Sequence, residues 1–172
     1  MEILKKPIWR VPLVLGVTGI GLRFLTYILA FISVKIQRAS GPDPATGAYY
    51  ITGGYVTEIM AVIGFLAFWG MGWKFVRGLS RKDIFLSATI MVAWHTALLA
   101  AEQLRQAAGG YSMLVYRLWT TVEATGWVDQ IMIRVFDQVS IPVMIPGLLA
   151  PYLYLLLAGT AHQTPASSGK AL

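Results

Sequence analysis

Long apolar blocks dominate the pattern of hydrophobic and polar positions along this chain. A helix needs about 20 apolar residues to cross the hydrocarbon core of a bilayer, and four blocks are long enough. They extend from about 11 to 34, 51 to 75, 84 to 104 and 139 to 159. The pattern therefore predicts an all-α integral membrane protein with about four transmembrane helices.

The residues between the third and fourth blocks show a different, amphipathic pattern. After Gly126, the residues Asp129, Gln130 and Arg134 fall on one helical face and apolar residues fall on the other. This pattern is typical of helices that lie in the membrane interface or cap a bundle. We therefore expect amphipathic interfacial helices here, with Trp119 and Trp127 near the outer membrane surface. The main alternative is a fifth span, which would move the C-terminus to the outside.

Composition supports a membrane location. The 172 residues are 56% hydrophobic and 13% charged, whereas a soluble domain averages about 25% charged residues. The net charge of +6 comes from residues at the ends of the apolar blocks, so we interpret it as an orientation signal and not as a nucleic-acid site. The short second loop illustrates this with Lys74, Arg77, Arg81 and Lys82.

This charge distribution predicts a protein of a bacterial-type inner membrane, with both of its termini in the cytoplasm. We expect residues 1–161 to form a single transmembrane helical domain and residues 162–172 to form a disordered polar C-terminal tail. The expected partner is the lipid bilayer itself.

The absence of cysteine excludes several kinds of chemistry. Disulfides, thiol catalysis, cysteine-ligated zinc and iron–sulfur clusters all require cysteine, and the chain has none. One of its two histidines, His162, falls in the polar tail, which argues against a haem held by two histidines. The glycine-rich phosphate loop with its Lys and Ser or Thr is also missing. The sequence therefore identifies no cofactor, metal ligand or catalytic residue.

Ionisable residues in and beside the predicted spans are the candidate binding residues. Such side chains are costly in hydrocarbon and normally face protein or a water-filled cavity. The candidates are Arg23, Glu58, His95, Glu102 and Asp137. Glu102 is expected about 3 Å below the outer boundary, Glu58 about 10 Å, His95 about 13 Å and Arg23 about 16 Å. This arrangement predicts an outward-facing polar cavity that binds or transports a small solute or ion.

Each candidate has a functional and a structural interpretation. Arg23 would neutralise an anionic group, while Glu58 and His95 would bind polar groups or exchange a proton. Asp137 would lie at the mouth of the cavity. Alternatively, Arg23 and Glu58 form a structural ion pair between helices. His95 would then be a neutral imidazole bonded across helices, and Glu102 and Asp137 would be solvated.

Proline interrupts the fourth block at three positions, 142, 146 and 151. Each proline removes a backbone donor and clashes with the preceding turn, so we expect a kinked helix. Broken spans often form binding sites in transporters.

Two other functions remain open. The small residues Ala93, Ala97 and Ala101 share a helical face that would let another helix approach closely. This favours a homo-oligomer or a non-catalytic subunit of a larger membrane complex. The second alternative is a membrane enzyme that acts on lipid headgroups, with Glu58, His95 and Glu102 as acid–base groups.

Overall fold

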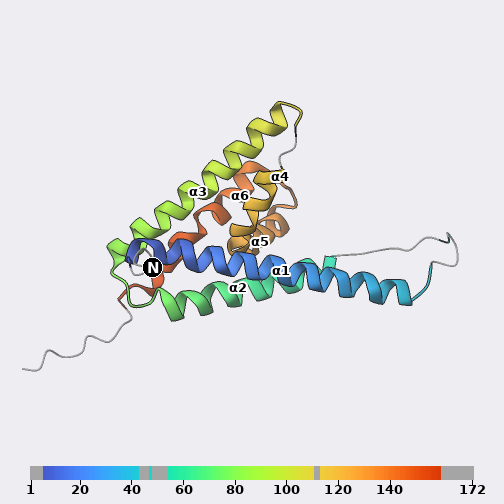
Figure 1. The fold of residues 1–172 in the computed structure, drawn as a ribbon, viewed down its shortest axis with the longest axis horizontal. Helices are drawn as coiled ribbons and strands as arrows, with labels where there is room; N and C mark the ends of the chain where they lie inside the picture. The colour runs from blue at the N-terminus through green and yellow to red at the C-terminus, as the bar shows by residue number, and fades with distance from the viewer. Residues whose placement is uncertain (1–5, 43–46, 48–53, 111–112, 160–172) are drawn as a thin grey trace, which may run out of the picture.

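The computed structural model describes residues 6–42, 47, 54–110 and 113–159, and its regular elements within these ranges are all helical (Figure 1). Three of the described helices are long and apolar enough to cross a membrane. They are α1 (Arg10–Ala39, after the 3₁₀ turn η2, Pro7–Trp9), α2 (Gly54–Phe75) and α3 (Arg81–Ala107). The prediction of a helical membrane protein is confirmed to this extent. The predicted tail, 162–172, lies outside the described residues.

The start of α1 is fastened to α3 by one buried serine. The first N–H groups of a helix have no partner within the helix. Here the Val11 N–H donates to Ser87 Oγ at 3.0 Å, and the Ser87 hydroxyl donates to the Ile8 carbonyl at 2.7 Å. Ser87 therefore satisfies two backbone groups of the N-terminal turn at once.

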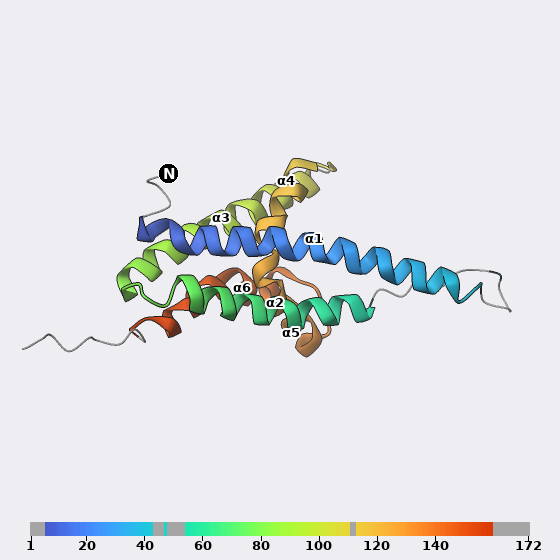
Figure 2. The same ribbon diagram turned by 60° about the horizontal axis from the view of Figure 1, so that its bottom comes forward.

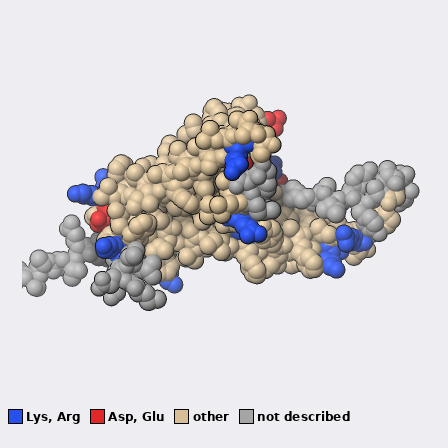
Figure 3. Space-filling view, turned by 45° about the horizontal axis from the view of Figure 1, so that its top comes forward, with Lys and Arg blue, Asp and Glu red and all other residues tan. Residues whose placement is uncertain are grey.

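The turn between α2 and α3 lies at the same end of the bundle as the first described residues (Figure 1). Ser80 caps α3 by accepting a hydrogen bond from the Asp83 N–H at 3.1 Å, as serine commonly does at this position. Figure 3 shows Lys and Arg at both ends of the molecule and near its middle, on a face that is mostly uncharged. Arg77 lies in this turn, and Arg81 and Lys82 lie at the start of α3.

The fourth apolar block is not a fourth long helix. It consists of α6 (Ile141–Leu149) followed directly by the 3₁₀ helix η5 (Ala150–Leu157), which together are shorter than the three long helices. Pro142 lies in the first turn of α6, where the missing donor is tolerated. Pro146 and Pro151 each remove a donor farther along the chain. This accounts for the change from α to 3₁₀ geometry.

The chain between α3 and α6 lies against the long helices instead of forming a separate cap. It comprises α4 (Met113–Leu118), η3 (Trp119–Thr121), η4 (Glu123–Thr125) and α5 (Gly126–Phe136). We call the part from η3 to α5 the crossing segment, because it passes α1 near the middle of that helix (Figure 2). η3 and η4 pack on α1, while α5 packs on α2 and α6.

Part of the crossing segment is buried by the surrounding helices. Val122, Ala124 and Thr125 are buried. The indole nitrogens of Trp119 and Trp127 are buried as well and have no hydrogen-bond partner among the described residues. The location of this segment at the outer interface stays a prediction. An amphipathic pattern shows that a helix has a polar face, but it does not show whether water or protein meets that face.

Close contacts at glycines and an aromatic cluster hold the bundle together. A Cβ atom at Gly19 would clash with the Thr120 carbonyl of the crossing segment, and one at Gly72 would clash with the Tyr154 ring. Tyr154 stacks on Phe68 with ring centroids 4.3 Å apart, and its hydroxyl donates to the Phe68 carbonyl at 3.0 Å. These contacts pack η5 and the crossing segment against the long helices.

The outward faces of the long helices are apolar. Phe24 and Phe31 of α1 and Leu66 of α2 are among many exposed large hydrophobic side chains. Apolar surface of this extent would be unfavourable in water. The exposed faces therefore suit a lipid environment, as do the length and composition of the three helices.

Replacing Gly19 by alanine tests the contact between α1 and the crossing segment. We expect Gly19→Ala to lower the free energy of unfolding by about 1–3 kcal/mol, because backbone atoms of η3 occupy the space of the new methyl group. Thermal unfolding of the purified protein in detergent measures this loss.

Gly16→Ala is the matched control on the same helix. A Cβ atom at Gly16 meets no atom within 4 Å, and alanine is the better helix former. Its melting temperature should equal or exceed that of the wild type. Equal melting temperatures for the two variants would contradict the close contact at Gly19.

Candidate functional site

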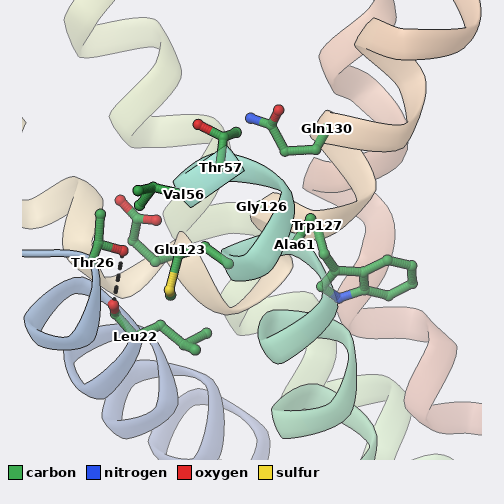
Figure 4. Close-up of a pocket in the computed structure, with 10 residues that line it drawn as sticks. Leu22, Thr26, Val56, Thr57, Ala61, Glu123, Gly126, Trp127 and Gln130 are labelled. Atoms are coloured by element: carbon green, nitrogen blue, oxygen red, sulfur yellow. Dashed lines mark hydrogen bonds between the residues drawn. The ribbon is translucent and has the colours of Figure 1, made fainter. Parts of the chain in front are cut away.

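A partly polar pocket of about 190 Å³ lies between α1, α2, η4 and α5 (Figure 4). A cavity of about 150 Å³ suffices for benzene, so the pocket has room for a small organic molecule. Its polar lining residues come from all four elements. They are Thr26 of α1, Thr57 of α2, Glu123 of η4 and Gln130 of α5. Figure 4 shows the polar ends of Thr57 and Gln130 on the same side of the pocket.

An ion pair between α1 and the crossing segment fixes the carboxylate in this pocket. Arg23 Nη1 lies 2.6 Å from Glu123 Oε1, and the two side chains are only 21% and 30% exposed. Arg23 also donates from Nε to the Tyr27 hydroxyl at 3.3 Å. Because isolated charges are costly in a membrane, this pairing explains how both groups can lie inside the bundle.

Arg23 and Glu58 do not form the ion pair with each other that the sequence suggested. The sequence interpretation paired these residues with each other, but Arg23 pairs with Glu123 and Glu58 pairs with Arg134 of α5. Glu58 lines a neighbouring pocket of about 300 Å³, which shares Thr57 and Gln130 with the first pocket. Glu123 thus lines the first pocket and Glu58 the second, and Thr57 and Gln130 line both.

The other three predicted residues lie elsewhere. His95 of α3 is buried and lines a separate small cavity. Glu102, half-buried near the end of α3, accepts a hydrogen bond from Gln106 at 3.3 Å. Asp137 is exposed and ends α5 in a left-handed conformation with φ 48°. A binding role for each of the five candidates stays a prediction.

The expected hydrogen bond from His95 to another helix is not present in the described part of the chain. Both ring nitrogens are buried without a hydrogen-bond partner there. The predicted hydrogen bond between the His95 imidazole and a group on another helix is therefore not found among the described residues.

Helix α5 presents its polar face to protein and its apolar face outward. Gln130 lines the pocket, Arg134 pairs with Glu58 and Asp129 packs against Gly147 of α6. Ile131 and Val135, on the other face, are exposed. The apolar face of α5 is thus exposed, while Gln130 and Asp129 on its polar face contact neighbouring elements.

Sequence reasoning did not select Glu123, Thr57, Gln130 or Asp129 as site residues. Asp129 and Gln130 were assigned to the polar face of an interfacial helix. One signal was available: Arg23 inside a span requires an acidic partner. Glu123 lies 100 positions away in the sequence, so only the position of the crossing segment identifies it.

Burial changes the acid–base behaviour of Asp129. Desolvation raises the pKa of its carboxyl from 3.8 to about 7, because an apolar environment disfavours the charged form. A Cβ atom at position 147 would overlap this carboxylate, so a glycine in α6 is what lets Asp129 lie there.

No protein-family model, curated protein or solved structure matches this chain. The fold defines a helical protein with three candidate membrane-spanning helices. Its function has to be argued from the pocket and the charges around it.

A double-mutant cycle can measure the ion pair at the pocket. We expect a coupling of about 1–3 kcal/mol between Arg23→Ala and Glu123→Ala in the free energy of unfolding, because the two groups are largely removed from solvent. The control is the same cycle for Arg134 and Glu58. Their side chains are 67% and 60% exposed, so a coupling below about 1 kcal/mol is expected. A larger coupling for the exposed pair would contradict this ranking.

The raised pKa of Asp129 predicts how stability depends on pH. Between about pH 4 and pH 7 folded Asp129 retains a proton that unfolded Asp129 loses, so its contribution to the free energy of unfolding should fall as the pH rises through this window. Asp129→Asn should remove this contribution, so the free energy of unfolding of the wild type should fall relative to that of the variant across the window. Melting temperatures in detergent across the window provide the measurement.

Asp137→Asn is the control for this pH dependence. Asp137 is exposed, and asparagine tolerates its left-handed backbone. The variant should retain the wild-type slope. A wild-type slope in Asp129→Asn as well would show that another group causes it.

Proposed function

We propose that this protein binds or transports a small polar solute or ion in the pocket between α1, α2 and α5. The observation that carries the proposal is the Glu123 carboxylate, which Arg23 holds at the wall of a pocket of about 190 Å³. Thr57 and Gln130 add a hydroxyl and an amide to the same pocket.

The chemistry of these groups favours a ligand with hydrogen-bond donors. A carboxylate only accepts hydrogen bonds, while a hydroxyl and an amide can both accept and donate them. Because Arg23 already pairs with Glu123, an anion would have to compete with that carboxylate. We therefore propose a neutral polar molecule or a single cation, in place of the anionic group that Arg23 alone suggests.

The proposed topology places the pocket toward the outer side of the membrane. We propose that α6 and η5 together form a fourth span, since they would extend about 30 Å at about 1.5 Å per α-helical and 2.0 Å per 3₁₀ residue. The basic loop between α2 and α3 favours the cytoplasm for that end. Thr26 then lies about 24 Å along α1 from Arg10.

A second candidate function is assembly with another membrane helix. Ala93 and Ala97 of α3 are exposed and line an apolar groove of about 500 Å³ beside α1. Small residues permit close helix packing, so this face supports a homo-oligomer or a subunit role. The enzyme hypothesis gains no such support, because His95 and Glu102 have separate surroundings.

Ligand-dependent stabilisation tests the proposed function. Native mass spectrometry first identifies small molecules that co-purify, and these are added with a panel of amino acids, polyols and ammonium. A true ligand at 100 times its Kd should stabilise the wild type by about 2.7 kcal/mol. Glu123→Gln and Thr57→Val should lose most of this effect, because each removes a polar group of the pocket.

Thr96→Val is the matched control for Thr57→Val. Thr96 is also exposed, and its hydroxyl donates to the Val92 carbonyl within α3, away from the pocket. It should respond to ligand like the wild type. Equal responses from Thr57→Val, Glu123→Gln and the wild type would reject this pocket as the binding site.

A further inference from the structure

A second cavity lies on the other side of the crossing segment, against α3 and α6. Its volume of about 20 Å³ is slightly above the 10–15 Å³ or so that one water molecule requires. The cavity is lined by His95, Leu99, Trp119, Val122, Asp129, Met144 and Leu148. Nothing in the proposed solute site involves these residues.

Four buried polar atoms without partners belong to residues that line this cavity. His95 is 1% exposed, and neither of its ring nitrogens has a hydrogen-bond partner in the described part of the chain. The same is true of Trp119 Nε1 and Asp129 Oδ1. Each buried group left unsatisfied costs about 1–3 kcal/mol, so four such atoms around one cavity indicate a bound guest.

Hydrogen-bonding chemistry selects water as this guest. The Trp119 N–H can only donate, the O–H of a protonated Asp129 donates, and an imidazole nitrogen without a proton accepts. A water molecule can accept from Trp119 and Asp129 and donate to His95, which gives the three bonds typical of buried water. Ammonium could not accept from Trp119. The described residues also contain no cluster of three or more His, Cys, Asp or Glu side chains that could hold a metal ion.

Asp129 and His95 are the titratable residues that line the cavity. The residues contributed by α6, Met144 and Leu148, are apolar. The charged groups on neighbouring elements have partners elsewhere: Glu123 pairs with Arg23, Arg134 pairs with Glu58, and Glu102 accepts from Gln106. The cavity therefore isolates one carboxyl and one imidazole.

We infer that this cavity binds one water molecule through which Asp129 of α5 and His95 of α3 share an exchangeable proton. The proton rests on Asp129, because burial disfavours both a carboxylate and an imidazolium. In the exchange step the Asp129 carboxylic acid donates its proton to the water, and the water releases one of its own protons to a nitrogen of His95. The products are a carboxylate and an imidazolium, so charge and atoms balance, and the reverse step restores the starting state. Burial places the pKa of Asp129 at about 7, so the site can hold or lose its proton near neutral pH.

Infrared spectroscopy of the full-length protein in detergent can follow this proton. The carboxylic-acid band that Asp129→Asn removes reports protonation of Asp129, and its intensity gives a titration midpoint. His95→Gln should move that midpoint by about 1 pH unit or more, because coupled groups titrate together. Trp119→Phe should also move it, because it removes a hydrogen-bond donor that holds the water. A water O–H band that shifts in heavy-oxygen water should be present in the wild type and absent in Trp119→Phe.

Trp127→Phe is the matched control for Trp119→Phe. The Trp127 indole nitrogen is also buried without a partner, but this side chain lines the solute pocket instead of the cavity. The variant should keep both the midpoint and the water band.

Several outcomes would overturn the inference. An unchanged midpoint in both His95→Gln and Trp119→Phe would show that Asp129 titrates alone. A wild type without the water band, or one with a stoichiometric metal whose chelation removes the coupling, would exclude a shared water. If His95→Gln fails to fold, Trp119→Phe and the wild-type water band still decide the question. No solute is added in this experiment, so its failure is separate from failure of the proposed function.

Discussion

The ion pair between Arg23 and Glu123 determines how the rest of the bundle is arranged. An arginine on a membrane-spanning helix needs an acidic partner within reach, and the chain supplies it from a segment 100 residues away. That partner requires η4 to lie against α1, and Gly19 provides the room for neighbouring η3. Once the crossing segment is inside the bundle, it separates two polar spaces. Gln130 lines the larger pocket, and Asp129 lines the small cavity.

The three long helices could be predicted from the sequence to within a few residues at most ends. The predicted blocks from 11 to 34, 51 to 75 and 84 to 104 correspond to Arg10–Ala39, Gly54–Phe75 and Arg81–Ala107. Hydrophobic length decides such elements locally, since a bilayer accepts any sufficiently long apolar helix. The fourth block was harder to predict, because its prolines change the backbone geometry without changing its hydrophobicity.

The site was less predictable, because its residues depend on tertiary packing. The polar face of α5 could be predicted from the sequence. However, the sequence pattern of such a face is the same whether water or protein covers it. The candidates Arg23, Glu58 and His95 were identified as ionisable groups within apolar segments. Arg23 and Glu58 form ion pairs, and His95 lines a cavity. Their neighbours, Glu123, Arg134 and Asp129, come from the region between the third and fourth apolar blocks, and only tertiary packing brings these residues together.

The length of α1 has a consequence for the surrounding membrane. Its predicted apolar block from 11 to 34 measures about 35 Å at about 1.5 Å per residue, whereas the hydrocarbon core is about 30 Å thick. Helices with such a mismatch tilt or locally thicken the bilayer, at a fraction of a kcal/mol per ångström. Ser33 near the far end of α1 accepts a hydrogen bond from Gln37 at 3.1 Å and contacts Tyr55 of α2, so a tilt of α1 would carry the start of α2 with it. In a bilayer, a change in thickness that tilts α1 would therefore also move α2, the other long helix that lines the pocket.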